Sequence, residues 1–438
     1  MSRRRNILFL TNRVPYPPNK GDKIRTYHQL DHLALSHNVY CGCFVDGDED
    51  VPRAKELGWW CKGVIAVRWR KSVAAMQAAA GLFRGRTLTA SAYRDDILME
   101  KVKAWGEKVH FDVAVAFSTM MAPYALAVPA DRHVLDMCDV DSEKWADYAR
   151  KLPFPASLLC RREARRLREY ERHCLRVFDA TMLINRRERR LLDPSECHER
   201  LHVVPNGARL ARQQDSKALP AEPVVGFLGS MDYRPNVDGI CWFVNKVWPE
   251  VIREVPPARL LIVGRNPTLR VRRLARKRGV TVTGAVADVR EYLDRCRIVV
   301  APLRIARGLQ NKVLEAMAVR RPVVATSAVA DGLMVQPGHN IVVADEAEPF
   351  ARKVADLCRF DELCRAIGEA GQRCVAMHYC WAQALQDYER TVLGEDRSGA
   401  QELPEEGPVV AGRNAVSRAA SGLSRATSKP PPQPLVVG

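Results

Sequence analysis

The sequence lacks any CxxC pair and any apolar run long enough to cross a membrane. Its thirteen cysteines are dispersed along the chain, a pattern that a reducing cytoplasm permits, and we interpret them as small buried hydrophobic residues. The first apolar run covers only residues 7–11, which is too short for a signal peptide or a membrane span. We therefore expect a cytoplasmic protein whose membrane association, if any, is peripheral at the inner face of the cell membrane.

Several catalytic and binding signatures are also missing. There is no GxSxG nucleophile elbow and no Walker phosphate loop, which excludes the common serine hydrolases and P-loop proteins. No zinc-finger, helix-turn-helix or RNP-like pattern occurs, and no aromatic residues are interleaved with the arginine clusters. We therefore expect no nucleic-acid partner.

Positive charge is abundant and unevenly placed. The formal net charge is +17, and residues 161–190 hold eleven arginines. Residues 265–278 add seven basic residues without an acidic one. Such clusters favour nucleotide phosphates or anionic lipid headgroups, although a solvated basic helix face is an equally good interpretation.

Two α/β domains are indicated by the length and the hydrophobic pattern. Strand-like runs alternate with helical segments, which predicts parallel sheets covered by helices on both faces. The predicted strands are residues 7–11, 39–45, 64–67, 113–117, 133–136, 180–184, 201–204, 224–228, 260–263, 280–283, 298–301 and 322–326. A polar, proline-bounded stretch at 211–223 indicates a linker. We predict an N-terminal domain at 1–208, a C-terminal domain at 209–375 and a disordered tail at 394–438.

The segment 307–326 carries the strongest chemical signal. A buried strand leads through a loop with Gly308 into a helix with Lys312 and Glu315 near its start. Backbone N–H groups at a helix N-terminus attract phosphate, and a lysine there adds a full charge. A glutamate one turn later is placed to accept the hydroxyls of a ribose. The alternative is a salt bridge between Lys312 and Glu315 on the helix face.

This segment resembles the donor-site signature of the retaining GT-B glycosyltransferases of family 4. In that family two glutamates eight positions apart flank the start of the helix. Glu315 matches the second, which implies that it holds the donor ribose. Arg307 occupies the place of the first, which contacts hydroxyls of the transferred sugar. The resemblance extends over residues 5 to about 392 and implies two Rossmann-like domains facing across a cleft, with C-terminal helices at 376–393 packing back on the first domain.

Three further segments match the family in order. Residues 225–236 are similar to the opening strand and loop of the donor domain, which implies that Gly229 and Ser230 line the donor site and that Arg234 shares the diphosphate with Lys312. Gly21 lies in a loop similar to the family's first glycine-containing loop, to which Lys20 or Lys23 adds charge.

Residues 133–145 look most like the subgroup associated with exosortase (PEP-CTERM) sorting and exopolysaccharide loci. In this segment Asp139 is a candidate catalytic residue that binds acceptor hydroxyls or stabilises charge at the anomeric carbon. It is an equally good candidate for the N-cap of the next helix, a role that Asp141 or Ser142 would also fill.

Metal binding is the weaker interpretation of two short patterns. Asp139-Val-Asp141 spells the DxD by which other glycosyltransferases hold a divalent metal, and His28 and His32 are spaced as two zinc ligands. The DxD lies in the first half of the chain, away from the segment with Lys312 and Glu315, and the two histidines have no third ligand nearby in the sequence. We therefore expect no metal and no cofactor.

The resulting expectation is a metal-independent retaining glycosyltransferase. It would move a hexose-type sugar from a nucleoside-diphosphate sugar to a glycan or lipid-linked acceptor in exopolysaccharide or cell-envelope synthesis. Because Arg307 replaces a family glutamate, the alternative is a nucleotide-sugar or glycan-binding protein without activity. A second alternative is a scaffold that binds polyanions.

Overall fold

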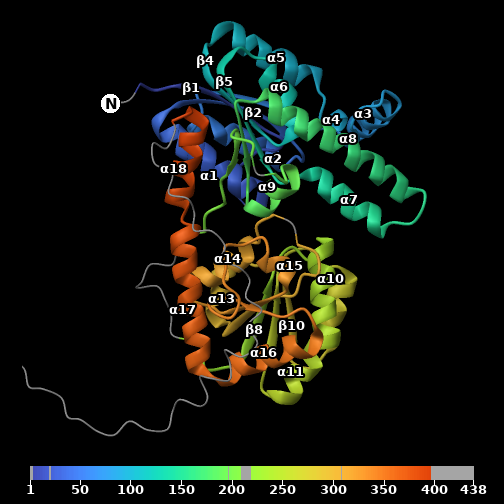
Figure 1. Cartoon of the computed structure of the whole chain (residues 1–438), viewed down its shortest axis with the longest axis vertical. Helices are drawn as coiled ribbons and strands as arrows, with labels where there is room; N and C mark the ends of the chain where they lie inside the picture. Colours follow the sequence, from blue (N-terminus) through green and yellow to red (C-terminus); the bar gives the residue numbers. More distant parts are fainter. Residues whose placement is uncertain (1–2, 19–20, 196, 209–218, 307, 396–438) are drawn as a thin grey trace, which may run out of the picture. The chain divides into compact units, whose positions relative to one another are not determined.

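The computed structural model describes residues 3–18, 21–195, 197–208, 219–306 and 308–395. The predicted tail from residue 396 on, most of the predicted linker, Lys20 and Arg307 lie outside the described residues. The described residues belong to one compact unit and form two parallel sheets (Figure 1). No helix among them is long and apolar enough to cross a membrane.

The first sheet has seven strands in the order β3-β2-β1-β4-β5-β6-β7. All neighbours pair in parallel; for example, Ile7 of β1 lies opposite Val113 of β4. Buried apolar runs form the central strands, as parallel sheets covered on both faces require. The strands are β1 (Asn6–Thr11), β2 (Asn38–Val45), β3 (Gly63–Arg68), β4 (Phe111–Phe117), β5 (Ala130–Cys138), β6 (Ala180–Leu183) and β7 (Leu201–Val203).

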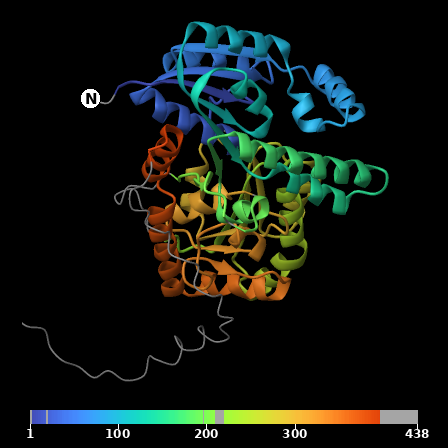
Figure 2. The same ribbon diagram turned by 45° about the horizontal axis from the view of Figure 1, so that its top comes forward.

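Helices cover both faces of this sheet (Figure 2). One face packs against Leu98, Val102, Tyr124 and Leu175, and the other against Leu30 and Leu33. The helical segments are α1 (Gly21–Ser36), α2 (Asp50–Glu56), η1 (Leu57–Trp59), α3 (Lys71–Phe83), α4 (Leu88–Ala92), α5 (Asp96–Lys108), η2 (Thr119–Met121), α6 (Ala122–Leu126), α7 (Asp141–Lys151), α8 (Ala156–Val177) and α9 (Arg186–Leu192).

The second sheet has six parallel strands in the order β10-β9-β8-β11-β12-β13. Its strands are β8 (Val224–Leu228), β9 (Arg259–Val263), β10 (Val280–Gly284), β11 (Ile298–Ala301), β12 (Val323–Ala325) and β13 (Val342–Val343). The helical segments are α10 (Arg234–Trp242), η4 (Phe243–Val247), α11 (Trp248–Glu254), α12 (Leu269–Arg272), η5 (Arg273–Arg276), α13 (Val289–Arg295), α14 (Asn311–Ala318), α15 (Ser327–Ala330), α16 (Ala347–Arg359) and α17 (Asp361–His378).

The last helix returns to the first sheet. Helix α18 (Trp381–Leu393) buries Tyr388 and Val392 in the same cluster as strands β1 and β2, and it lies beside α1 in Figures 1 and 2. Residues 376–378, in contrast, still belong to α17, whose Cys374 and Val375 pack on the second sheet. The return therefore begins at Trp381.

The predicted fold class is confirmed: each of the twelve predicted strands is present. Within the described residues, the strand that the sequence pattern missed is β13, which has two residues and is too short to show a period. Both strand orders reverse direction once, between β1 and β4 and between β8 and β11. In open α/β sheets, ligands bind outside the carboxyl ends of the strands at such a switch point.

Candidate functional site

The switch point of the second sheet is bordered by two loops. One begins with Gly229 directly after β8, and the other joins Ala301 at the end of β11 to helix α14. Helix α14 begins at Asn311, and its N-cap Gln310 makes no capping hydrogen bond through its side chain. The N–H groups of Asn311 and Val313 donate to the carbonyl oxygens of Leu309 and Gln310 at 3.2 and 2.8 Å. The positive end of the helix dipole still faces this loop and favours an anion there.

Lys312 lies in the first turn of α14 and reaches toward β8. Its Nζ donates a hydrogen bond to Oδ1 of Asn236 at 2.5 Å and lies 5.0 Å from the ring centre of Phe227. Removal of the ammonium group from water lowers the pKa of Lys312 to about 7. The predicted alternative of a salt bridge to Glu315 is wrong, since the ammonium group bonds to Asn236 instead.

Asn236 connects Lys312 to the loop after β8. Its Nδ2 donates to the carbonyl oxygen of Ser230 at 2.9 Å. Gly229 has a φ of 149°, and a Cβ there would lie 2.6 Å from Nδ2 of Asn236. Glycine at 229 therefore permits the approach of the amide that holds Lys312.

Arg265 contacts the loop after β8, and the sequence analysis did not identify it as a site residue. It follows β9 after Gly264, and its Nε donates to Oγ of Ser230 at 3.2 Å. Its position in the sequence could have identified it, because residues directly after neighbouring parallel strands gather at one edge of the sheet.

Arg234 and Glu315 are both exposed. Arg234 is the first residue of α10, two positions before Asn236. Glu315 lies one turn after Lys312 on α14. Although the Glu315 side chain reaches solvent, desolvation by nearby protein raises the pKa of its carboxyl group, and the charge of Arg290 opposes that rise.

Gly308 and Asp139 meet although they come from different sheets. Gly308 has a φ of 62°, and a Cβ on it would lie 2.6 Å from Oδ1 of Asp139. Asp139 follows β5 after Cys138, which itself has a φ of 63°. Oδ1 of Asp139 is buried and has no hydrogen-bond partner among the described residues. The structure thus places an unpaired carboxylate oxygen against the loop that leads to α14.

The N-cap interpretation of Asp139 is wrong. Helix α7 has Val140 as its N-cap. The N–H of Val140 donates to Glu188, and both the N–H and the hydroxyl of Ser142 donate to Glu171. Because two glutamates satisfy this helix start, Asp139 is not needed there.

Lys144 forms ion pairs with both aspartates of the DxD pattern. Its Nζ lies 3.0 Å from Oδ2 of Asp139 and 2.8 Å from Oδ1 of Asp141. An ammonium group thus lies where the DxD interpretation would put a cation. No group of three or more metal-binding side chains occurs within the described ranges.

The remaining candidates lie elsewhere in the first domain. Gly21 is exposed at the start of α1, with no atom within 4 Å of a Cβ built on it. Lys23 is buried and pairs with Asp50 at 2.8 Å, so it does not supply a free charge. His28 stacks on Trp381 with ring centres 4.1 Å apart, and His32 bonds to Glu389 at 2.8 Å. The two histidines therefore interact with α18 rather than with each other.

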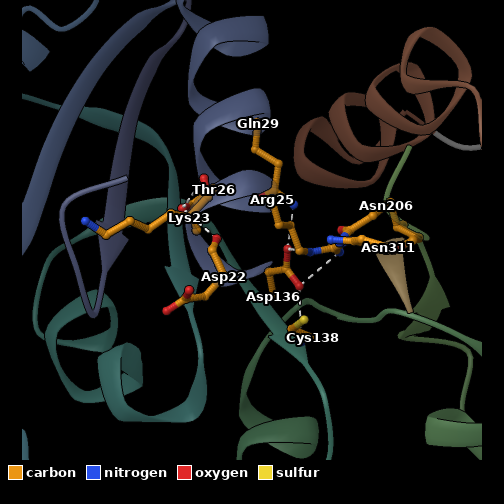
Figure 3. Close-up of polar contacts among 10 residues, drawn as sticks. Asp22, Lys23, Arg25, Thr26, Gln29, Asp136, Cys138, Asn206 and Asn311 are labelled. Carbon is orange, nitrogen blue, oxygen red and sulfur yellow. Dashed lines mark hydrogen bonds and ion pairs between the residues drawn. The ribbon is translucent and has the colours of Figure 1, made fainter. Parts of the chain in front are cut away.

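A buried polar network underlies the turn that carries Asp139 (Figure 3). Arg25 of α1 binds both carboxylate oxygens of Asp136, at 2.7 and 3.1 Å, and Gln29 donates to the same carboxylate at 2.6 Å. Asp136 also accepts from the N–H of Cys138 at 3.2 Å. Burial alone would lower the pKa of Arg25, but the adjacent Asp136 reverses this effect and the pKa is raised.

Arg25 is also linked, through Asn206, to the start of α14. Its Nη1 donates to Oδ1 of Asn206 at 3.0 Å, and Nδ2 of Asn206 lies 3.5 Å from Oδ1 of Asn311. The network therefore runs from α1 through the end of β5 to the first residue of the helix that holds Lys312 (Figure 3). Sequence analysis did not identify it, because its hydrogen-bonded members lie up to 181 positions apart.

Comparisons with known proteins agree with this architecture. Residues 222–359 match the family described as glycosyl transferases group 1. The chain is 28% identical over 141 residues to the putative glycosyltransferase EpsD of Bacillus subtilis (strain 168), which is 31% of this chain and 36% of EpsD. The alignments to curated relatives thus span about a third of those relatives.

Solved structures match over most of the chain. Sucrose-phosphate synthase from Thermosynechococcus elongatus is 17% identical with a TM-score of 0.64, covering 88% of this chain and 98% of that one. HepE of Anabaena, in complex with UDP and glucose, is 15% identical with a TM-score of 0.59, covering 89% and 100%. The chain therefore has the GT-B fold, and its second domain contains the segment that matches the group 1 glycosyl transferases.

Proposed function

We propose that the protein is a glycosyltransferase that moves a hexose-type sugar from a nucleoside-diphosphate sugar to an acceptor with retention of the anomeric configuration. The observation that carries this proposal is the group formed by Lys312, Asn236, Ser230 and Arg265 beside the N-terminus of α14. Two cations and a helix N-terminus at a switch point suit a diphosphate. HepE was solved with UDP and glucose, which supports UDP as the first nucleotide to test.

In this proposal the diphosphate lies between the α14 N-terminus and the loop after β8. Lys312, with Arg265 and the exposed Arg234, neutralises the charge that develops on the departing diphosphate. Glu315 accepts hydrogen bonds from the ribose. Oδ1 of Asp139, buried without a described partner, faces the sugar or the acceptor hydroxyl from the first domain.

The finer assignments are part of the proposal. Because Lys144 bridges Asp139 and Asp141, we propose that transfer needs no tightly bound metal or other cofactor. The acceptor is a glycan or a lipid-linked sugar in exopolysaccharide or cell-envelope synthesis, in a pathway of the exosortase type, and the protein acts in the cytoplasm at the membrane.

Calorimetry with UDP tests the donor site. We expect Lys312→Ala to weaken UDP binding at least about tenfold, because a charge-assisted hydrogen bond to the diphosphate is lost. Lys246→Ala is the matched control, since Lys246 is an exposed lysine of the same domain in η4. Equal affinities of the wild type and Lys312→Ala would contradict the proposed site.

A rival function is nucleotide-sugar binding without turnover. It is favoured by Arg307, which stands where the family has a sugar-contacting glutamate. Release of UDP from UDP-glucose separates the two functions: we expect the wild type to release UDP and Lys312→Ala to do so at a much lower rate. Tight donor binding with no release of UDP and no transfer by the wild type would support the rival.

A further inference from the structure

Helix α3 is an apolar helix with an uncovered apolar face. It has thirteen residues, and the twelve that follow Lys71 contain no charged side chain. The residues at helical spacing on its outer side are exposed, including Met76 at 67% and Phe83 at 88%. Ala79 and Ala80 lie between them and are also exposed, as is Ala75 before Met76. Large exposed apolar side chains on one helix face mark an interaction surface rather than ordinary solvent exposure.

Cations flank this face at both ends. Arg70 and Lys71 precede it, and Arg84 and Arg86 follow it, all exposed. Helix α8 holds the C-terminal end of α3 in place, because Nη2 of Arg162 donates to the carbonyl oxygens of Leu82 and Arg86 at 3.0 and 3.2 Å. The face is therefore fixed beside the arginine-rich helix.

The start of α8 extends the same pattern. Phe154 and Leu158, at the turn between α7 and α8, are 80% and 59% exposed. The outward positions that follow are Arg161, Arg165 and Arg172, which are exposed and make no ion pair with a described residue. Arg161, Arg165 and Arg172 also line a groove between α7 and α8. Glu169, which pairs with Arg166, lines the same groove. Arg161 and Arg165 are four positions apart, and like charges at this spacing on a helix repel one another, so an anionic partner stabilises this pair.

We infer that the exposed face of α3, the α7–α8 turn and the arginines beside them form a docking surface for an anionic phospholipid bilayer. We call this the lipid-facing surface. Aromatic and aliphatic side chains enter the interface between headgroups and acyl chains, while the arginines bind the headgroup phosphates. The figures show α3, α7 and α8 projecting from the same side of the first domain (Figures 1 and 2).

The charge and the apolar side chains of the lipid-facing surface argue against a second copy of the chain and against a nucleic acid. A second copy of the chain would bring the same arginines against one another. A nucleic acid would match the arginines but would leave Met76, Phe83 and Phe154 in water, since these side chains are not interleaved with the basic positions. Only an anionic bilayer satisfies the apolar and the cationic parts together.

The inference extends the proposed function without depending on turnover. Asp139 lies immediately before α7, and the lipid-facing turn lies at the other end of that helix. A helix of eleven residues is about 16 Å long. A bilayer at the lipid-facing surface therefore brings a lipid-linked acceptor near Asp139.

Vesicle sedimentation of the full chain tests the surface. The probes are phosphatidylcholine vesicles with and without phosphatidylglycerol, at low and high NaCl. We expect binding only to the anionic vesicles, weakened by salt. Met76→Gln/Phe83→Gln lowers that affinity about tenfold or more, and Arg84→Gln/Arg161→Gln/Arg165→Gln lowers it about 100-fold.

Matched controls replace exposed apolar and basic side chains outside the lipid-facing surface. Leu269→Gln/Met377→Gln replaces two apolar side chains that are each 71% exposed, and Arg273→Gln/Arg276→Gln/Arg278→Gln removes three exposed charges of the second domain. Both controls should bind anionic vesicles as the wild type does. Unchanged thermal unfolding and unchanged UDP affinity show that each variant is folded, and they separate this test from that of the donor site.

Three outcomes would overturn the inference. The first is no binding of the wild type to anionic vesicles at low salt. The second is an equal loss in the control variants. The third is binding to single-stranded RNA that is tighter than vesicle binding and is insensitive to Met76→Gln/Phe83→Gln, which would assign the surface to nucleic acid.

Discussion

Lys312 is the residue whose charge state controls the proposed donor site. Its lowered pKa, about 7, means that the free protein loses this positive charge as the pH rises through that value. A diphosphate favours the ammonium form, so donor binding takes up a proton above pH 7. We expect the affinity for UDP-glucose to fall as the pH rises from about 6 to about 8.5. Above the pKa of Lys312 the affinity falls by at most about tenfold per pH unit.

UDP-glucose is the better probe here than UDP, because it has no terminal phosphate that titrates in this range. Lys312→Arg should retain its affinity at the higher pH, since a guanidinium group stays charged. Lys312→Ala should bind weakly with little pH dependence. Calorimetry across this range checks the expectation, and identical wild-type affinities at both ends would contradict it.

Gly308 offers a second test at this scale. Gly308→Ala introduces a Cβ in a left-handed conformation and against Asp139. Gly338→Ala is the matched control, because Gly338 has a φ of 82° but nothing within 4 Å. We expect both variants to lose about 1 kcal/mol of stability from backbone strain, and only Gly308→Ala to lose transfer activity, about tenfold or more. Equal activities of the two variants would show that the Asp139 contact has no catalytic consequence.

The site was only partly predictable at the level of single residues. Gly229 and Ser230 directly follow β8, and Gly308 and Lys312 lie in the loop and helix after β11, so their place at the sheet edge was evident from the pattern. Asn236, Arg265 and the pair of Arg25 with Asp136 were not identified. Their roles depend on contacts between distant segments, which local spacing does not encode.

At the scale of the elements, the ion pair of Arg25 and Asp136 joins α1 to β5. The side chains are 1% and 0% exposed, and Arg25→Met would leave the carboxylate buried without its partner. We expect a loss of about 3–5 kcal/mol in the free energy of unfolding. Urea denaturation measures it. Arg304→Met is the control, because the Arg304 and Asp238 side chains are 53% and 30% exposed, and it should cost no more than about 1 kcal/mol.

Helix α18 supplies another element-scale test through Tyr388. This side chain is 1% exposed and packs with the β1 and β2 residues, yet its hydroxyl has no hydrogen-bond partner within the described part of the chain. Tyr388→Ala should cost about 3–5 kcal/mol through the cavity. Tyr388→Phe should change stability by less than about 1 kcal/mol, because no hydrogen bond is removed. A large loss in Tyr388→Phe, measured by thermal or urea unfolding, would reveal a partner for the hydroxyl.

The elements themselves were largely predictable. Parallel strands buried on both faces are continuous apolar runs bounded by turns, so their positions are visible in the sequence. The uncovered apolar face of α3 was not noticed, because a run of alanines with Met76 and Phe83 also suits a buried helix. Only its observed exposure distinguishes the two.

At the scale of the whole molecule, two Rossmann-like sheets meet where Asp139 approaches Gly308 and where Asn206 approaches Asn311. The two-domain architecture followed from the repeated alternation of strands and helices, but these meeting points did not. They combine a donor-type edge from the second sheet with a carboxylate from the first, and the proposed transfer depends on this combination.

A crystal structure of the protein with UDP is the decisive test of this arrangement. We expect the diphosphate between Nζ of Lys312, the N-terminus of α14 and the loop at Ser230, with the ribose against Glu315. UDP bound away from these residues, or Lys312 still bonded to Asn236 with the phosphates out of its reach, would contradict it.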